Sequence, residues 1–215
     1  MKQIFYDWGG FNVKLFHMVN GIDGGPFYDK LMLLGTFLAE RHNFPIYLLI
    51  FIGFGLASLA RHRRSDFYPA YRGLWVNVVF VFVIGFLLDW AFLDWAKHYF
   101  HFPRPYMALT PDTMRTIGNP MAPNQQYLSF PSGHASFAAL IAASLWPALR
   151  QPEKMLAFLF VIWVCMSRLA LGVHFPMDLL TGAFTALLIV LMVRAGANRI
   201  PYLSSERVKE IPANR

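Results

Sequence analysis

The sequence predicts an all-α fold, a polytopic membrane helix bundle with five transmembrane helices preceded by amphipathic helices. Two observations predict it. Apolar residues make up 56% of the 215 residues, and Asp, Glu, Lys and Arg make up only 14%, whereas about a quarter of a soluble domain is charged. Several apolar segments also approach the roughly 20 residues that cross a bilayer. The composition excludes a disordered chain, a coiled coil and a DNA-binding arm, and the length fits one domain, 1–215.

The first 43 residues are predicted to lie on the external surface of the membrane. Apolar and charged residues interleave over 5–19, which is typical of an amphipathic helix in the interface. A turn rich in glycine follows at 20–26, and the segment Phe27–Ala39 is short for a span and charged at its start. A sixth, tilted span drawn from 27–43 is the alternative.

The five predicted spans form a core at 44–195, and a basic cytoplasmic tail follows at 196–215. The third span is short and rich in Ala and Ser, which favours close packing by neighbouring helices. The spans cover Phe44–Ala60, Leu74–Ala96, Gly133–Leu149, Met155–Val173 and Phe175–Val193.

The net charge of +7 indicates the orientation of these spans. The loops 61–73 and 150–154 and the tail from Arg194 hold eleven basic and four acidic residues, so they carry the whole excess. By the positive-inside rule these pieces are cytoplasmic. The long loop Lys97–Ser132 and the turn at His174 therefore face the opposite side together. On so apolar a chain, a basic balance indicates an anionic membrane surface or an anionic substrate, and no nucleic acid partner is expected.

Ionisable residues in or beside spans are costly, and here they collect at the non-cytoplasmic ends of three spans. The first group is Lys97 with Arg104 in the following loop. Asp89 and Asp94 share a helix face with Lys97, so they either orient its ammonium or form an ordinary interfacial ion pair with it. Prolines on both sides of Arg104 impose an extended backbone that restricts the guanidinium. Taken alone, the two cations are more typical of interfacial anchors.

The second group opens a helix. Ser132 is a favoured N-cap residue, and Gly133 allows the backbone to approach a ligand closely. Free N–H groups and the helix dipole then create an anion site, with His134 in the first turn beside it. A capped helix start without a ligand accounts for Ser132 and leaves His134 unexplained.

The third group joins the last two spans. Arg168 lies near the external end of an apolar helix, where a neutral residue costs less. Pro176 suits the opening turn of the last span, and Asp178 can reach back to one imidazole nitrogen of His174, leaving the other free to attack. A histidine–carboxylate pair also occurs around zinc, but the neighbouring Lys and Arg repel a cation, so no metal site is expected.

Together the three groups supply three cations, a helix N-terminus and two histidines, one of them with a carboxylate. Arg suits bidentate phosphate contacts, and Lys adds a point charge. Phosphoryl transfer without a metal needs positive charge on the phosphate oxygens, a nucleophile and an acid for the leaving group. These residues supply all three.

At these residues the sequence resembles the type 2 phosphatidic acid phosphatase superfamily. The three-part signature of that family reads here as Lys97 to Arg104-Pro105, then Pro131-Ser132-Gly133-His134, then Ser167-Arg168 to His174 to Asp178. Every position and spacing matches. One such motif is weak evidence, whereas three in order are specific.

The resemblance implies a role for each matching position. His174 would be the nucleophile that forms a phosphohistidine, Asp178 would orient it, and His134 would protonate the leaving oxygen and then activate water. The phosphate would be held by Lys97, Arg104, Ser132, Gly133 and Arg168. Members of the family need no metal or other cofactor, and they usually have a six-helix core. This chain departs from the pattern at its N-terminus, where the usual first span is missing.

The function that the resemblance implies is an integral lipid phosphatase of the inner (plasma) membrane, with its catalytic face on the periplasmic or external side. Its partners would be the bilayer and a phosphorylated lipid: undecaprenyl diphosphate, phosphatidylglycerophosphate, phosphatidic acid or lipid A. No obligate protein partner is implied. The alternative is a phosphotransferase that passes the phosphate from His174 to another lipid. A non-catalytic lipid-binding or transport protein is a second alternative, which predicts decay of His174 or His134, and both are present.

Substrate specificity is predicted to lie in the loop Tyr106–Phe130 and in the N-terminal helices. Apolar side chains of the loop that could line a lipid entry are Met107, Leu109, Met114, Ile117, Met121 and Tyr127. Arg115 and Gln125–Gln126 could touch a second phosphate or a headgroup. A loop resting on the bilayer is the alternative.

Overall fold

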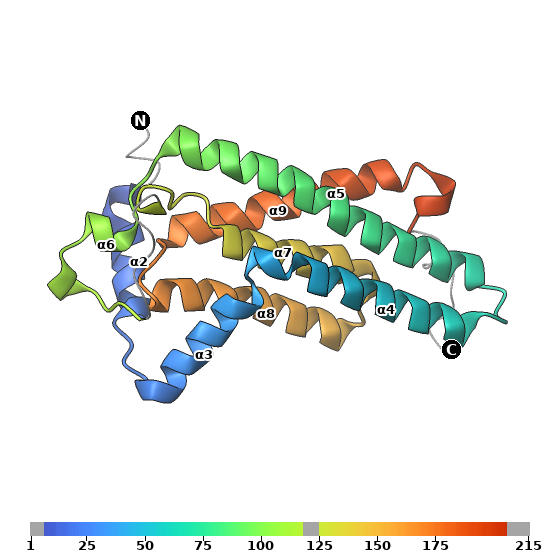
Figure 1. The fold of residues 1–215 in the computed structure, drawn as a ribbon, viewed down its shortest axis with the longest axis horizontal. Coiled ribbons are helices and arrows are strands. Elements are labelled where there is room, and N and C mark those ends of the chain that lie inside the picture. The colour runs from blue at the N-terminus through green and yellow to red at the C-terminus, as the bar shows by residue number, and fades with distance from the viewer. Residues whose placement is uncertain (1–6, 118–124, 206–215) are drawn as a thin grey trace.

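The computed structural model describes residues 7–117 and 125–205, and within these ranges it contains helices and no strands (Figure 1). The α-helices are α2 Phe11–Asn20, α3 Gly25–Leu38, α4 Phe44–His62, α5 Tyr68–Phe100, α6 Pro105–Ala108, α7 Gly133–Leu145, α8 Gln151–Ala170 and α9 Pro176–Ala197. Short 3-10 turns lie at Trp8–Gly10, Arg41–Asn43, Pro111–Thr113, Trp146–Ala148 and Pro201–Leu203. The predicted all-α class is confirmed.

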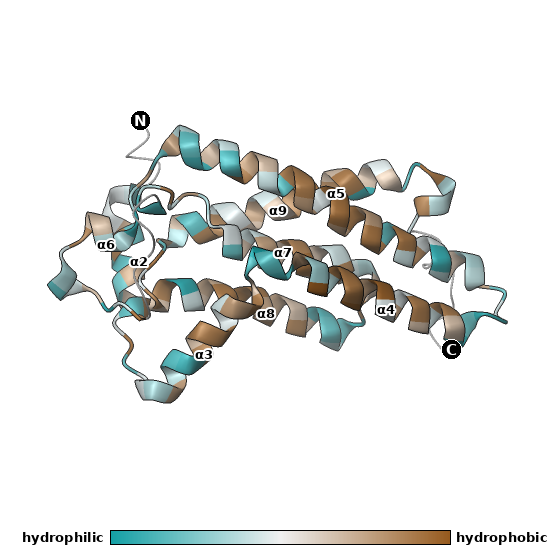
Figure 2. Cartoon of the chain, in the orientation of Figure 1, coloured by the Kyte–Doolittle hydropathy of each residue, from teal (hydrophilic) through white to brown (hydrophobic). Residues whose placement is uncertain are grey.

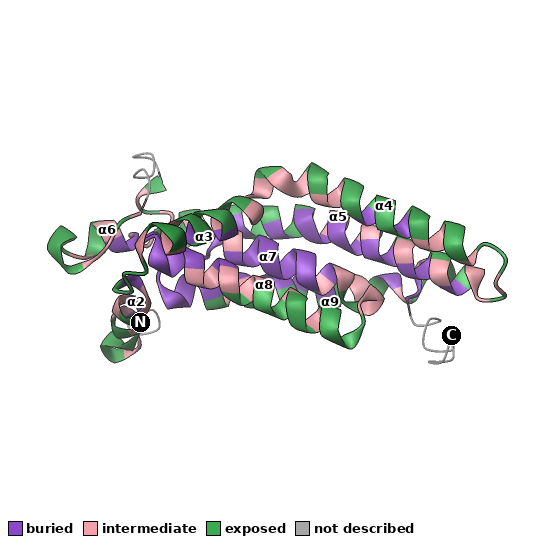
Figure 3. Ribbon diagram, turned by 90° about the horizontal axis from the view of Figure 1, so that it is seen from below, coloured by how far each residue is buried: buried purple, intermediate pink, exposed green. Residues whose placement is uncertain are grey.

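Five helices, α4, α5, α7, α8 and α9, run along the length of the molecule (Figure 1). α7 occupies the centre, where it contacts α5, α8 and α9. Figure 3 shows α7 largely buried, while the outer faces of its neighbours are exposed. Phe82, Phe137 and Leu140 are among the fully buried side chains of the core around it.

The composition of α7 explains its central position. Ala and Ser occupy most of its 13 positions, so neighbouring helices can approach closely. At Gly85 of α5 a Cβ would lie 2.9 Å from Cδ1 of Leu140, which shows how close one such contact is. The predicted close packing is confirmed, but the α-helix ends at Leu145 instead of Leu149. Pro147 explains the early end, because its ring has no N–H to continue the hydrogen-bond ladder.

In the described ranges, three helical stretches are long and apolar enough to cross a membrane, and they contain α4, α5 and α9. Figure 2 shows apolar residues concentrated in the middle of the bundle and polar residues toward its ends. α7 has 13 residues, about 20 Å in length, and α8 contains three charged residues, Glu153, Lys154 and Arg168. Five spans therefore stay a prediction, with three supported by length and composition.

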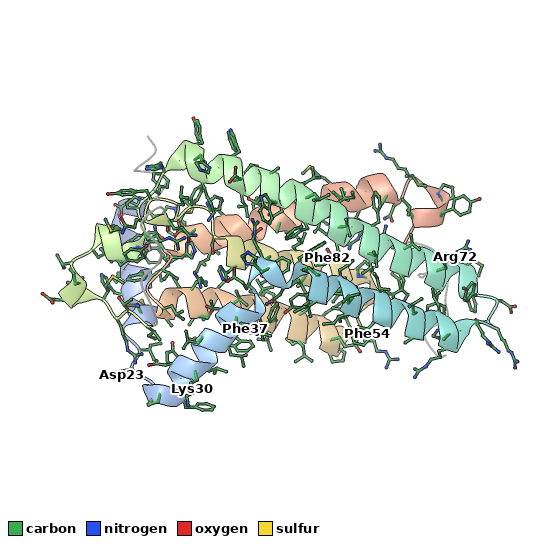
Figure 4. The ribbon with its side chains drawn as sticks, in the orientation of Figure 1. Asp23, Lys30, Phe37, Phe54, Arg72 and Phe82 are labelled. Atoms are coloured by element: carbon green, nitrogen blue, oxygen red, sulfur yellow. The ribbon has the colours of Figure 1, made fainter. Side chains whose placement is uncertain are left out.

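The N-terminal residues form two helices at one end of the bundle, as the sequence predicts. α3 has 14 residues, about 21 Å, which is shorter than the roughly 30 Å hydrocarbon core. It runs obliquely to the bundle and contacts α8, where Met32 packs in a cluster with Ala170 and Leu171. Figure 4 shows Lys30 and Phe37 along this helix. The three stretches that are long and apolar enough to cross a membrane do not include this segment, so the structure gives no support for a sixth span here.

α2 packs against protein through a buried face that includes two polar residues, Asn12 and Asn20. The Asn12 side-chain oxygen accepts a hydrogen bond from the Met177 N–H in the first turn of α9 (3.0 Å). The Asn20 amide exchanges two 2.7 Å hydrogen bonds with the main chain of Arg115. α2 therefore fastens two distant segments to the end of the bundle.

The basic loops lie at the end opposite α2 and α3, where Figure 4 labels Arg72. There the residues after α9 fold back on α5, and the Asn77 side chain donates a 2.6 Å hydrogen bond to the Leu203 carbonyl. A Cβ at Gly73 would lie 2.8 Å from the Ser204 carbonyl oxygen. The beginning of the predicted tail is thus packed against the core.

Arg194 of α9 closes the inner end of α7. Its Nη2 donates to the carbonyls of Ala143 (3.0 Å) and Ser144 (2.8 Å). These carbonyls lie in the last turn of α7, where the i→i+4 ladder runs out, and the Ala143 carbonyl also accepts a hydrogen bond from the Trp146 N–H.

Candidate active site

The three sequence motifs meet at the end of the bundle that carries α2 and α3. Lys97 and Arg168 lie in the last turns of α5 and α8, whereas His134 and Asp178 lie in the first turns of α7 and α9. Consecutive helices run in opposite directions, so these two helix ends and two helix starts gather on one side. The fold therefore brings together every residue that the motifs predict.

His174 and Asp178 form a buried pair one turn apart. Nδ1 of His174 lies 3.2 Å from Oδ2 of Asp178. The same oxygen accepts hydrogen bonds from Oγ of Ser129 (2.6 Å) and from the Phe175 N–H (2.9 Å). Because the carboxylate accepts, Nδ1 carries the proton and Nε2 presents a lone pair. The contact predicted from the four-residue spacing is present, and Ser129 is an additional partner that the sequence reasoning missed.

The second nitrogen of His174 faces cations. Nη1 of Arg104 lies 3.3 Å from Nε2 and also donates to the Val173 carbonyl (3.0 Å). Burial, followed by the charges of Arg104, Arg168 and Lys97, holds the pKa of His174 well below its usual value of 6.5. The imidazole is therefore neutral, and hence nucleophilic, before substrate binds.

The contacts of Lys97 differ from the prediction. Its Nζ donates to the Leu128 carbonyl (3.3 Å) in the loop before the second motif. Asp94 is exposed and pairs with a neighbouring histidine, and the buried Asp89 binds Arg41. The expectation that these two carboxylates orient Lys97 is therefore wrong, because one faces away from the site and the other has a cation from another segment. In the described ranges Lys97 has no carboxylate partner, so its charge is available to an anion.

Ser132 is the N-cap residue of α7, as predicted, but its hydroxyl makes no capping hydrogen bond. The hydroxyl is fully buried and has no partner among the described residues. The backbone is held instead by the Ser132 N–H, which donates to the Asp178 carbonyl (2.9 Å). Gly182 permits this approach of α9, since a Cβ there would collide with the Ser132 carbonyl. The hydroxyl and the first N–H groups of α7 together suit an anion.

Arg168 is 3% exposed in the last turn of α8. Its Nη1 donates to Oγ1 of Thr36 in α3 (3.2 Å), whereas its Nε is buried without a partner in the part of the chain described. A buried guanidinium with an unsatisfied donor is costly unless an anion completes its surroundings. α3 thus helps to position a cation of the third motif, which the sequence reasoning did not anticipate.

His134 has a carboxylate partner that the sequence reasoning missed. Its Nε2 lies 3.0 Å from Oε2 of Glu40, which precedes it by 94 residues and lies between α3 and α4. The hydrogen bond from His134 outweighs the effect of burial and lowers the pKa of Glu40 to about 2, so the carboxylate is ionised. A charged pair, Glu40-Arg41, before an apolar span is the one local signal, and it is also typical of an interfacial anchor.

Arg41 adds a fourth cation beside the start of α7. It forms an ion pair with Asp89, which also accepts a hydrogen bond from Ser136 of α7. A Cβ at Gly133 would lie 3.3 Å from Nε of Arg41, so the guanidinium lies against the helix start. This Nε is buried and has no hydrogen-bond partner within the described ranges.

Three of the six apolar side chains predicted to line a lipid entry pack inward. Leu109 and Met114 join a core cluster with Phe16 of α2, and Ile117 packs beside Met32 of α3. Burying these side chains against the N-terminal helices is favourable because it removes apolar area from water. The remaining predicted residues are Met107 and Tyr127, which are exposed, and Met121, which lies outside the described residues.

The polar residues of the same loop have structural partners. Arg115 forms ion pairs with Asp29 (3.0 Å) and Asp23 (3.1 Å), which hold the loop to the N-terminal segment. The carbonyls of Gln125 and Gln126 accept hydrogen bonds from the Arg104 side chain and N–H, both at 2.9 Å. These residues position Arg104 and the loop, so the predicted contact of Arg115 with a headgroup is not supported.

The arrangement can transfer a phosphoryl group. It presents a neutral imidazole, a second imidazole at a helix start, and cations that converge on the space between them. Within the described ranges, no group of three His, Cys, Asp or Glu side chains could hold a metal ion. The positive charge in the site is that of arginine and lysine side chains, which can stabilise charge on phosphate oxygens.

The PAP2 superfamily model matches residues 74–201, which is more than half of the chain and includes all three motifs. An undecaprenyl-diphosphatase of Sulfolobus acidocaldarius is 26% identical over 175 residues, covering 80% of this chain and 72% of that protein. A lipid A 1-phosphatase of Rhizobium etli is 28% identical over 152 residues, 67% of this chain and 60% of that protein. The chain thus spans about three fifths of the length of the latter relative.

Two solved structures share the fold. LpxE of Aquifex aeolicus matches with a TM-score of 0.66 and 23% identity, covering 85% of this chain and 94% of that one. The first transmembrane PAP2-type phosphatidylglycerolphosphate phosphatase from Bacillus subtilis matches with a TM-score of 0.61 and 21% identity, over 90% and 88% of the two chains. At these identities the likeness concerns the fold.

Proposed function

Since the chain belongs to the PAP2 superfamily and is a membrane lipid phosphatase, we propose that it hydrolyses the phosphomonoester or diphosphate of its lipid through a phosphohistidine on His174. Asp178 orients the nucleophile and His134 is the general acid and base. The phosphate is bound by Lys97, Arg104, Ser132, the Gly133 amide and Arg168. The lysine and the two arginines among these groups carry the positive charge that a metal ion supplies in other phosphatases.

In the first step, Nε2 of His174 attacks phosphorus as the bond from phosphorus to the leaving oxygen breaks. The electron pair of that bond goes to the leaving oxygen, which takes a proton from His134. In the second step, neutral His134 accepts a proton from water as the water oxygen attacks phosphorus. The phosphorus–nitrogen bond breaks and its electron pair returns to His174, so both histidines regain their starting states.

The observation that carries the proposal is a set of buried polar atoms without partners among the described residues. Ser132 Oγ, Arg168 Nε and Arg41 Nε are all of this kind, and they come from segments that meet at the start of α7. Leaving such groups unsatisfied costs about 1–3 kcal/mol each, and more for charged ones. A phosphate group bound beside His174 would satisfy them, which is why we infer that this place is built for an anion.

An apolar groove supports a lipid substrate. It lies between α7, α8 and α9, has a volume of about 530 Å³, and is lined by small residues of α7 such as Ala139 and Ala142. Its lining on α9 begins at Leu180, two residues after Asp178. The groove offers an apolar surface for a hydrocarbon chain beside three of the helices that carry the site. The substrate class is undecaprenyl diphosphate, phosphatidylglycerophosphate, phosphatidic acid or lipid A.

The catalytic end is proposed to face the periplasm or exterior of the inner membrane. The loops 61–73 and 150–154 carry basic residues at the other end of the bundle, which the positive-inside rule assigns to the cytoplasm. Labelling of single introduced cysteines in intact cells, in a chain whose native cysteine is replaced, tests this orientation. A cysteine at exposed Met107 should react with an impermeant reagent, and one at Arg63 should not.

Phosphate release from the four lipids tests the proposed function. The protein is purified in detergent, and each lipid is supplied with EDTA present. We expect release from at least one lipid, unchanged by EDTA, and a base-stable, acid-labile phosphoryl group on the protein when turnover of labelled lipid is quenched. His174→Ala should give neither. Loss of activity in EDTA, or full activity of His174→Ala, would overturn the mechanism, and transfer of label to an added lipid acceptor would reveal a phosphotransferase.

A further inference from the structure

We propose that Glu40, between α3 and α4, is the positioning residue of the acid–base histidine: it holds a proton on Nε2 of His134 and so makes Nδ1 the nitrogen that exchanges protons with substrate and water. This inference rests on the proposed function. It extends the site to a segment outside all three motifs and outside the residues matched by the family model.

Glu40 is held in place from both sides. The preceding Ala39 is fully buried in a cluster with Ala138 of α7 and Val164 of α8. The following Arg41 is fastened to Asp89 of α5. The Glu40 carboxylate therefore reaches His134 from a backbone that three other helices fix, and side chains anchored in this way can set the orientation of a catalytic group.

The chemistry of the two partners assigns the protons. An ionised carboxylate can only accept hydrogen bonds, so the 3.0 Å contact requires a proton on Nε2 of His134. In the neutral imidazole Nδ1 then carries the lone pair, and in the imidazolium Nδ1 carries the second proton. That proton passes from Nδ1 to the leaving oxygen as its bond to phosphorus breaks, and Nδ1 later takes a proton from the attacking water.

The negative charge of Glu40 also stabilises the protonated form of His134. Burial of His134, followed by the positive charges of Arg168 in α8 and Lys97 in α5, disfavours the imidazolium that a general acid must form. Glu40 is the carboxylate that opposes them, and its other oxygen lies 3.4 Å from the exposed His42. Without this carboxylate, His134 would lose much of its capacity to hold the second proton beside so many cations.

The test compares two phosphomonoesters with the same tail in the variant Glu40→Gln, which keeps the shape and removes the charge. Dodecyl phosphate releases an alkoxide that must be protonated, whereas a nitrophenyl phosphate carrying a dodecyl tail releases a stable phenolate. We expect kcat for dodecyl phosphate to fall about 10- to 100-fold. Phosphohistidine formation from the aryl ester should change less than about threefold, and the intermediate should accumulate because water activation is slow.

Glu153→Gln is the matched control, because this glutamate caps α8 at the opposite end of the bundle through the Arg150 N–H. This variant should turn over both esters at the wild-type rate. Unchanged turnover of both esters in Glu40→Gln would overturn the inference, as would an equal loss on both without accumulation of phosphohistidine, which indicates a structural role. Failure of the wild-type chain to form phosphohistidine would instead overturn the proposed function, so the two failures are distinguishable.

Discussion

The active site contains two histidine–carboxylate pairs that are built in opposite ways. His174 and Asp178 lie four residues apart on one chain turn, and both are almost fully buried. His134 and Glu40 are 94 residues apart, and their side chains are 15% and 41% exposed. The first pair uses Nδ1 for its carboxylate and the second uses Nε2. The proposed nucleophile is thus fixed locally in the interior, whereas the proposed acid–base group depends on tertiary packing and is partly exposed.

This difference suits the two roles. A nucleophile must stay in one tautomer and one orientation, which a short, buried and triply hydrogen-bonded carboxylate such as Asp178 provides. An acid–base group must exchange protons with the leaving oxygen and with water, so partial exposure is useful to it. Substitutions in the two pairs should therefore have unequal effects.

The largest effect is expected for the nucleophile. His174→Ala should reduce phosphate release by about 10⁴-fold or more, with either a good or a poor leaving group, because no phosphoryl acceptor remains. His134→Ala should spare phosphohistidine formation from the aryl ester in comparison. Burst kinetics with the two esters measure this. If His174→Ala and His134→Ala respond identically to the leaving group, the assignment of the two roles is wrong.

A large effect is also expected for Asp178→Asn. The amide cannot hold the same tautomer of His174, so turnover should fall by about 10³-fold, more than in Glu40→Gln. Ser129→Ala, which removes one of the hydrogen bonds to Asp178, should reduce turnover by about tenfold or less. Steady-state kinetics of the purified variants decide the order. Equal losses in Asp178→Asn and Glu40→Gln would contradict the stronger role of the buried pair.

The pH dependence should separate the pairs further. Because the pKa of His174 is lowered, its imidazole is neutral at and below pH 6.5 and becomes protonated only in more acidic solution. kcat/KM for the aryl ester, whose leaving group needs little help from an acid, should therefore stay level as pH falls through 6.5. It should decline only at clearly lower pH, where His174 becomes protonated. The stability of the fold should change in the same direction. Below pH 6.5 the unfolded chain binds a proton at this histidine more readily than the folded chain does, so the free energy of unfolding decreases as pH falls. A decline of kcat/KM centred on pH 6.5 would indicate an unperturbed nucleophile.

The smallest effect on turnover is expected for a substitution in α2, which supports the chain just before His174 and should therefore affect mainly stability. Nδ2 of Asn20 donates to the carbonyls of Leu169 and Ala170 at the end of α8, just before the His174 turn. Asn20→Ala leaves these buried carbonyls without that partner and should cost about 1–3 kcal/mol of stability. Thermal unfolding in detergent measures the loss. Lys14→Ala, on the exposed side of the same helix, is the control and should change little.

The two pairs also show what the sequence could predict. The four-residue spacing of His174 and Asp178 spans one helical turn, so their contact follows from local geometry. The position of Ser132 at a helix start follows from its preference for the N-cap. The alternation of apolar segments with loops predicts that all three motifs lie on one side of the bundle, which the structure reproduces.

The remaining contacts depend on how helices pack, for which the sequence has no local signal. Nothing local marks Glu40 or Arg41 as part of the site, and the position of Asp89 on one helix face with Lys97 favours a contact between those two. In the structure Asp89 forms an ion pair with Arg41, whereas Lys97 donates to a carbonyl, so its charge is available to an anion. For the loop residues Arg115 and Met114, the sequence leaves substrate contact and a loop resting on the bilayer as alternatives, because nothing local shows that they pack against the N-terminal segment and α2.

The short α7 has a consequence for the surrounding lipid. Two carbonyls of its last turn accept hydrogen bonds from Arg194, and its 13 residues give a length of about 20 Å, shorter than a hydrocarbon layer of roughly 30 Å. The outer helices α4 and α5 are longer, with 19 and 33 residues. Because α7 is buried among its neighbours, these longer outer helices are the ones that meet the hydrocarbon layer, and a bilayer that does not match their length should strain the bundle. Turnover should therefore depend on the acyl-chain length of the host membrane, through the cost of hydrophobic mismatch.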